Sequence, residues 1–163
     1  MSAATEVVVR MGEYHVLRGE GVLAAVGLGS CVAIVLHDRH ARVAALAHVV
    51  LPSASLSREH DRPARFANTA VPLLLGGMKV EGADLARIVG RLVGGASMFA
   101  NLLAAGSVSM GERNVLAAQT ALRSAGVPIV AEDVGGTWGR SVFFDLGRGA
   151  GVVRSVGMED RVL

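Results

Sequence analysis

The chain has 163 residues, 52% of them hydrophobic, and we expect residues 1–163 to form a single domain. The formal net charge is only +2 and the basic residues are spread along the chain, which excludes a basic tract for nucleic acid. The single cysteine excludes a disulfide within the chain and favours a reducing, cytoplasmic setting. The N-terminus lacks a secretory signal, and the apolar stretch 22–36 is too short and glycine-rich to span a bilayer, so we expect no membrane insertion.

The first half of the chain is dominated by predicted strands. β-Branched residues predict two short strands around Gly12 within 5–19 and a third strand over 22–26. Two apolar runs within 31–52 enclose the polar segment HDRHAR, which predicts a β-hairpin. Residues 53–65 are polar and without periodicity, so we expect an exposed, mobile loop.

The second half alternates helices and strands. Apolar residues at helical spacing predict a helix over 66–78, although Pro72 disfavours a helix interior beyond the first turn. Residues 86–99 predict a strand that ends in a glycine turn, and Ser109 and Glu112 form a capping pair for a helix over 109–126. Three more strands are predicted at 127–136, 140–147 and 150–157. Strands outnumber helices, so the expected class is α+β or layered α/β.

The predicted hairpin brings the only cysteine close to a histidine. A turn centred between Arg39 and His40 pairs Cys31 directly with His48 on one face, at a Cβ separation of about 4.5–5.5 Å. A slip by one residue separates the two side chains. An imidazolium beside the thiol lowers the pKa of Cys31 and later protonates a leaving group. The neighbouring glycines let the backbone approach a substrate closely, so N–H groups at Gly29 and Ser30 can face an oxyanion.

Spacing alone leaves less specific interpretations open. A lone cysteine at the start of an apolar strand is more often a small buried hydrophobe. The histidines of HDRH, with His60, fix no metal geometry, and GLGSCV lacks the third glycine of a dinucleotide loop, so we expect neither a metal nor a cofactor. Asp133, within AEDVGG, is expected to fix a turn rather than to take part in catalysis.

Eight short segments together resemble one known family. In chain order they are GEYHV, GLGSCVAIVLHD, AHVVLP, RFANTAV, GGASMF, GERN, AEDVGG and GRSV. In this order and at similar spacing they resemble CheD, the family of chemoreceptor glutamine deamidases of bacterial and archaeal chemotaxis. The resemblance extends through nearly the whole chain, which is therefore expected to be a single CheD-like domain.

The resemblance implies a fold and a reaction. The fold is an α/β/β layered sandwich, and the reaction converts particular glutamine side chains of the chemoreceptor cytoplasmic domain to glutamate. Some members also hydrolyse glutamyl methyl esters there. By the resemblance, Cys31 is the nucleophile and His48 is its partner. The implied course is thiolate attack on the amide carbon, release of ammonia with a proton from His48, and hydrolysis of the thioester.

One departure from the family pattern keeps other functions open. The family often has a threonine six residues before the cysteine, and here Ala25 occupies that third triad position without a hydroxyl. A backbone carbonyl or a water can hold the imidazole instead; if the missing hydroxyl limits the rate, Ala25→Thr should raise turnover. The alternative function is a weakly catalytic or non-catalytic adaptor that binds and stimulates CheC, a chemotaxis phosphatase. Phe99 is then a partner-binding residue, or else a core aromatic. A remote third interpretation is an unrelated small-molecule thiol hydrolase.

Overall fold

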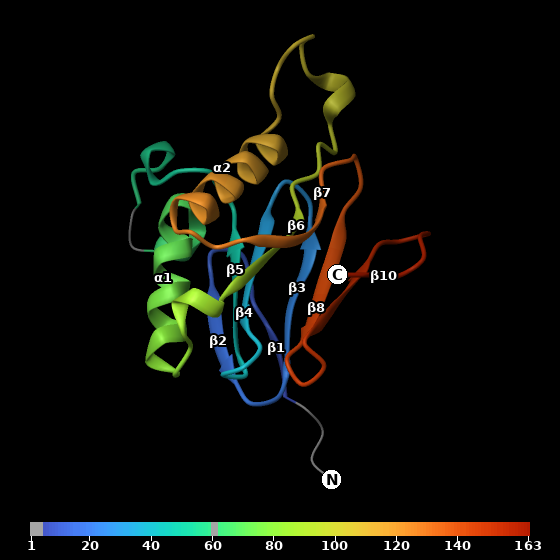
Figure 1. Ribbon diagram of the computed structural model, residues 1–163. Coiled ribbons are helices and arrows are strands. Elements are labelled where there is room, and N and C mark those ends of the chain that lie inside the picture. The colour runs from blue at the N-terminus through green and yellow to red at the C-terminus, as the bar shows by residue number, and fades with distance from the viewer. Residues whose placement is uncertain (1–4, 60–61) are drawn as a thin grey trace.

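Three layers of secondary structure make up the computed structural model, which describes residues 5–59 and 62–163. Two α-helices cover one face of a five-stranded sheet within these residues, and a second five-stranded sheet covers the other face (Figure 1). The predicted α+β class, as a layered α/β/β sandwich, is confirmed.

The middle sheet has the strand order β2-β5-β4-β6-β7, and the outer sheet has the order β1-β3-β8-β9-β10. The middle sheet consists of β2 (Tyr14–Arg18), β5 (Val43–Val49), β4 (Val32–Asp38), β6 (Val89–Gly94) and β7 (Ile129–Val134). The outer sheet consists of β1 (Glu6–Val8), β3 (Val22–Leu28), β8 (Arg140–Asp145), β9 (Ala150–Arg154) and β10 (Arg161–Val162). The strand β10 was not predicted from the sequence, and the other nine agree with the predicted strands.

Burial explains why the two central strands form the middle of the sandwich. Every residue of β4 and β5 is buried, because one face of the pair packs on the helices and the other packs on the outer sheet. A strand covered on both faces has a continuous apolar run, as VAIVL and VAALA show. In contrast, β8 alternates buried and half-buried residues, as expected for a strand with one face on the core.

The helical layer consists of α1 (Ala67–Val80) and α2 (Met110–Ser124). Both were predicted, and the Ser109 side chain caps α2 by accepting a hydrogen bond from the N–H of Glu112 at 3.1 Å. Pro72 lies inside α1, where its ring removes one helical hydrogen bond. The helix forms nevertheless because its apolar face is fully buried against the middle sheet; the buried residues are Ala67, Ala70, Val71, Leu74 and Met78.

The longest connections are the segment between β5 and α1 and the segment between β6 and α2. Residues 53–65, predicted as a polar loop, contain 3₁₀ turns at Ala54–Leu56 and Pro63–Arg65; further 3₁₀ turns lie at Leu85–Arg87 and Ala100–Leu102. The segment between β6 and α2 projects away from the sandwich at one end of the molecule (Figure 1). Within the described part of the chain, no helix is both long enough and apolar enough to cross a bilayer.

Candidate active site

The β4–β5 hairpin places Cys31 and His48 on one face, but in a register that differs from the predicted one. His48 lies opposite Ala33, so the predicted direct pairing with Cys31 is wrong by two residues. A shift by two residues leaves every side chain on its original face. Cys31 is therefore a diagonal neighbour of His48, a relation for which separations of about 7–8 Å are usual.

The loop of the hairpin explains this shift. The last pair of the ladder is Asp38 with Val43, so the loop contains residues 39–42 and is centred one residue later than predicted. The Asp38 carboxylate accepts a hydrogen bond from the N–H of Ala41 at 3.1 Å. Asp side chains that bind the backbone a few residues later stabilise turns of this kind. Arg42 closes the loop in the left-handed region, with φ of 57°.

Cys31 directly precedes β4, and a glycine turn after β6 packs on its backbone. The N–H of Gly95 donates to the carbonyl of Cys31, and the N–H of Ala96 donates to the carbonyl of Gly29, both at 2.8 Å. Gly94 has a φ of 113°, and a Cβ there would lie 2.3 Å from the Cys31 carbonyl oxygen. Only glycine fits such an approach. The first residues of the GGASMF motif thus hold the backbone on both sides of Ser30.

The Cys31 thiol is in a desolvated environment. The residue is 8% exposed and belongs to the apolar cluster between the two sheets. Burial raises the pKa of the Cys31 thiol, and the N–H of the same residue lowers it only in part. The expected lowering of this pKa by an imidazolium is therefore wrong, because burial disfavours the thiolate and His48 is too desolvated to be readily charged.

His48 is held in one orientation by a backbone carbonyl. The residue is 3% exposed, and its Nδ1 lies 3.0 Å from the carbonyl oxygen of Val9, to which an Nδ1–H donates. Its Nε2 is buried without a hydrogen-bond partner among the described residues. Burial lowers the pKa of His48, and the Val9 carbonyl and the Glu13 carboxylate raise it to a smaller extent. The imidazole is thus favoured in the neutral form, with the proton on Nδ1 and a lone pair on Nε2.

The backbone of His48 is fixed by the turn that precedes β2. The N–H of Gly12 donates to the carbonyl of His48 at 2.9 Å, and the N–H of His48 donates to the carbonyl of Glu13 at 3.0 Å. Gly12 adopts a φ of 77°, which favours glycine at this position. Gly12 and Glu13, the first two residues of GEYHV, therefore form hydrogen bonds with the backbone carbonyl and N–H of His48.

Position 25, which the resemblance implies as a third triad position, carries no side-chain hydroxyl, because the residue there is alanine. Ala25 is fully buried on β3, in the same apolar cluster as Cys31. The Val9 carbonyl provides the acceptor that orients the imidazole. Sequence reasoning anticipated an acceptor of this type but missed Val9, because a main-chain carbonyl has no signature in the residue letters.

A cavity of about 350 Å³ is lined by Ser30, the residue that directly precedes Cys31. Phe99 also lines it and is 71% exposed, which excludes the alternative of a core aromatic. The remaining lining residues are Ala96, Ser97, Met98, Leu103, Ser109, Met110 and Gly111. Ser97 and Ser109 join the two sides of this cavity, with their hydroxyl oxygens 2.5 Å apart.

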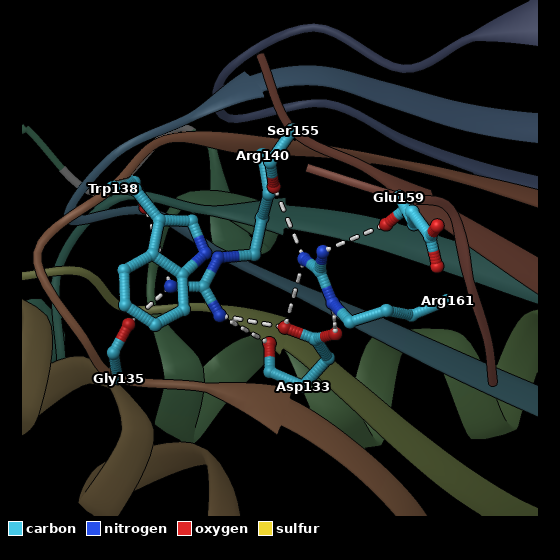
Figure 2. A network of polar contacts seen from close by, with 7 residues as sticks. All are labelled: Asp133, Gly135, Trp138, Arg140, Ser155, Glu159 and Arg161. Carbon is cyan, nitrogen blue, oxygen red and sulfur yellow. Dashed lines mark hydrogen bonds and ion pairs between the residues drawn. The ribbon is translucent and has the colours of Figure 1, made fainter. Parts of the chain in front are cut away.

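Asp133 was predicted to fix a turn, but its carboxylate instead binds arginines of two other strands. Its carboxylate accepts from Arg140 at 2.7 Å and from Arg161 at 2.5 Å, linking β7 to β8 and β10 (Figure 2). Arg140, 3% exposed, also donates to the carbonyls of Gly135 and Trp138 in the β7–β8 turn. Burial alone would raise the pKa of Asp133, but the hydrogen bonds from the two arginines lower it. The carboxylate is therefore occupied by arginines and is not free for acid–base chemistry.

Two of the three histidines considered as metal ligands, His37 and His40, lie within the described residues. His37 packs edge-on against Phe144, with ring centroids 5.1 Å apart, at the opposite end of β4 from Cys31. His60 lies outside the described residues. Within residues 5–59 and 62–163, no three His, Cys, Asp or Glu side chains form a group able to hold a metal ion.

The fold and the buried Cys–His pair define a layered α/β/β protein with a candidate thiol active site. A model of the family described as CheD chemotactic sensory transduction matches residues 50–155, a range that starts two residues after His48. The chain is 40% identical over 150 residues to the chemoreceptor glutamine deamidase CheD of Thermotoga maritima, covering 92% of each chain. It is also 40% identical over 149 residues to a probable chemoreceptor glutamine deamidase CheD of Caldanaerobacter subterraneus, covering 91% of this chain and 92% of that protein. The chain belongs to the CheD family.

Proposed function

We propose that this protein deamidates glutamine side chains of chemoreceptor cytoplasmic domains to glutamate, with Cys31 as the nucleophile and His48 as the general base and acid. The observation that carries the proposal is the state of His48. Its Nδ1 is bound to the Val9 carbonyl, which leaves the Nε2 lone pair on the face that bears the only cysteine. The names of the relatives give the substrate class, and we place the protein in the cytoplasm with that substrate.

The pair rests as a neutral thiol beside a neutral imidazole, because burial raises the pKa of Cys31 and lowers that of His48. The thiol proton therefore moves to Nε2 while the sulfur attacks the amide carbon, rather than before substrate binds. The developing charge on the carbonyl oxygen is stabilised by backbone N–H groups of the Gly29–Ser30 segment.

The remaining steps return the pair to its resting state. The imidazolium gives its proton to the amide nitrogen, the C–N bond breaks, and ammonia leaves a thioester on Cys31. Water then attacks the thioester, with His48 accepting one proton and returning it to the sulfur. The products are glutamate and the free thiol. The same steps on a glutamyl methyl ester release methanol in place of ammonia.

The substrate side chain approaches through the cavity beside Ser30. Cys31 is only 8% exposed and does not line this cavity, so a slim side chain must pass between Ser30 and the loop that carries Phe99 to reach the sulfur. The lining is largely apolar, which suits the methylene groups of glutamine, and the Ser97–Ser109 pair offers polar atoms to its amide.

A second candidate function is that of an adaptor for a CheC-type phosphatase, favoured by the surface of the β6–α2 loop. Five apolar side chains of this loop are 43–76% exposed: Met98, Phe99, Leu102, Leu103 and Val108. Exposed apolar groups that gather on one segment mark protein contact sites. We propose that receptor and phosphatase dock on this loop and compete for it, because the loop borders the cavity that the substrate must enter.

Mass spectrometry of a receptor cytoplasmic fragment tests the catalytic proposal. The fragment is incubated with the wild-type protein and with Cys31→Ala, and the mass change from amide to acid is followed at each glutamine. Conversion that requires Cys31 supports the proposal, whereas equal conversion by both proteins excludes Cys31 as the nucleophile. An inactive wild-type protein that binds the phosphatase tightly would favour the adaptor. Equally fast cleavage of a short synthetic amide would favour an unrelated thiol hydrolase.

A further inference from the structure

Asn114, in the second turn of α2, connects the two segments that carry the candidate catalytic pair. Its side chain is fully buried, and its amide nitrogen donates to the carbonyls of Ser30 and Val50, each at 2.9 Å. Ser30 directly precedes Cys31, and Val50 follows His48 by two residues. A single side-chain amide thus binds the segment just before β4 and the segment just after β5.

This contact lies where the pairing of the two strands ends. The β4–β5 ladder begins with the pair Val32–Val49, and beyond it the N–H of Val50 donates to the carbonyl of Arg65 instead, at 2.9 Å. The carbonyls of Ser30 and Val50 would otherwise face the buried side of α2 without a strand partner. Asn114 therefore takes the place of the next hydrogen-bonded pair of the ladder, and both N–H groups of its amide donate hydrogen bonds.

Burial of a polar amide at position 114 is unfavourable for folding, which indicates that the amide has a specific structural role. The other fully buried side chains on the same face of α2 are apolar, namely those of Ala118 and Leu122. The Asn114 carbonyl oxygen is buried without a hydrogen-bond partner among the described residues, which is unfavourable. An amide at this position is explained by the two carbonyls it binds rather than by packing.

The backbone hydrogen bonds from other loops each fix either the Cys31 segment or the His48 segment, but not both. Gly95 and Ala96 bind the Cys31 segment to the end of β6, while Gly12 and Glu13 bind His48 to the turn before β2. Asn114 is the described side chain that bonds to both segments at once.

We propose that Asn114 is a positioning residue that sets the separation of Cys31 and His48 by bridging the carbonyls of Ser30 and Val50. The proposal rests on the catalytic function proposed above. Asn114 does not touch the substrate, since both of its donors are engaged. A misplacement of about 1 Å between reacting groups lowers a rate by about 100-fold. Loss of the bridge should therefore lower kcat by about 10- to 100-fold and change KM little.

The test uses two variants and a matched control in the full chain. Asn114→Asp keeps the shape and removes the N–H donors, and Asn114→Ala removes the whole amide. Leu122→Val is the control, because it loosens the same buried face of α2 two turns away from the site. Conversion of the receptor fragment gives kcat and KM, measured at a temperature where unfolding curves show each variant to be folded. If Asn114→Asp does not fold, Asn114→Ala carries the test.

A second readout separates positioning from mere stability. The rate of Cys31 alkylation by iodoacetamide is measured with and without His48→Gln, in the wild-type and Asn114→Ala backgrounds. We expect His48→Gln to slow alkylation in the wild type and to have little effect in Asn114→Ala, since the imidazole there no longer reaches the thiol. A structural role alone gives the same slowing in both backgrounds.

The outcomes distinguish this proposal from the one on which it rests. Wild-type kcat in both Asn114 variants, an equal loss in Leu122→Val, or equal slowing by His48→Gln in both backgrounds overturns the positioning role alone. Conversion that is unaffected by Cys31→Ala or His48→Gln overturns the catalytic proposal, and the positioning role with it.

Discussion

The two ends of the β4–β5 hairpin both bury polar side chains, but they satisfy them differently. At the loop end, the fully buried Asp38 carboxylate accepts from the N–H groups of Ala41 and Asp84 at 3.1 and 2.8 Å. It also pairs with Arg87, whose Nη2 lies 3.2 Å from the carboxylate. At the open end, the described residues provide the His48 side chain with one partner, the Val9 carbonyl, and leave its Nε2 without one.

This difference separates stability from reactivity within one hairpin. A carboxylate with several donors is held in its charged form, and removal of any partner costs stability. A buried ring nitrogen without a partner is unfavourable for folding but keeps a lone pair available for a proton. The loop end therefore contributes to the fold, and the open end keeps the groups that the proposed reaction needs. Four substitutions test this division.

The largest effect is expected for His48→Gln. Loss of the proposed general base and acid should lower kcat for receptor deamidation by about 100- to 10,000-fold. The free energy of unfolding should change little, because the ring has a single hydrogen-bond partner within the part of the chain that the structure describes. Mass spectrometry of the receptor fragment measures the first quantity and urea unfolding the second. Activity within a few-fold of the wild type would remove His48 from the mechanism.

The next effect concerns His37 and the pH dependence of stability. Burial, with a contribution from Arg91, lowers the pKa of His37 from 6.5 to about 4. Between these values the unfolded chain binds a proton that the folded protein does not, so stability is complete above pH 6.5 and falls as the pH is lowered to 4. The loss is about 3 kcal/mol. His37→Gln should flatten this part of a urea-unfolding series, and an unchanged slope would contradict the prediction.

Asp38→Asn should have a smaller effect on stability and none on the reaction. The carboxylate hydrogen bonds from Asp84, Ala41 and Arg87 outweigh burial and lower the pKa of Asp38 to about 2. The stability that this group contributes is present above pH 3.8 and lost as the pH falls to 2; at neutral pH the substitution should cost about 2 kcal/mol. Urea unfolding at pH 7 measures the cost. A simultaneous loss of kcat would show that the two ends are coupled.

Ala25→Thr should have the smallest effect. Because the Val9 carbonyl already orients His48, an added hydroxyl should not raise kcat. Ala25 is fully buried, so the larger side chain should cost about 1 kcal/mol of stability through overpacking. Thermal unfolding and the deamidation assay provide the two numbers. A clear rise in kcat would show that the carbonyl is a poor substitute for the threonine.

Much of the fold could be predicted because the patterns that specify it are local. The apolar runs of β4 and β5, the Ser109 cap and the helical spacing of α1 and α2 all indicated the correct elements. The register of the hairpin was wrong by two residues, because it depends on the Asp38–Ala41 hydrogen bond and the left-handed Arg42 in the loop. The face shared by Cys31 and His48 was correct, since an even shift preserves it.

The environment of the candidate site was harder to predict from the sequence than the fold. The hairpin pattern and the family resemblance both indicated Cys31 and His48, but the direction of the Cys31 pKa shift depends on burial between two sheets, which no local pattern gives. In the sequence, Asn114 is noticeable only as the last residue of the motif GERN. Its two acceptors lie 84 and 64 residues away in the chain, so only the folded structure reveals the bridge.

His48 is oriented by the main-chain carbonyl of Val9, and this affects how the site responds to mutation. Every amino acid at position 9 brings the same peptide oxygen, so exchanges of that residue leave the acceptor in place as long as the strand keeps its course. The ring is then held in place without a hydroxyl at position 25. What selection must preserve is the path of the backbone, not the identity of a third side chain.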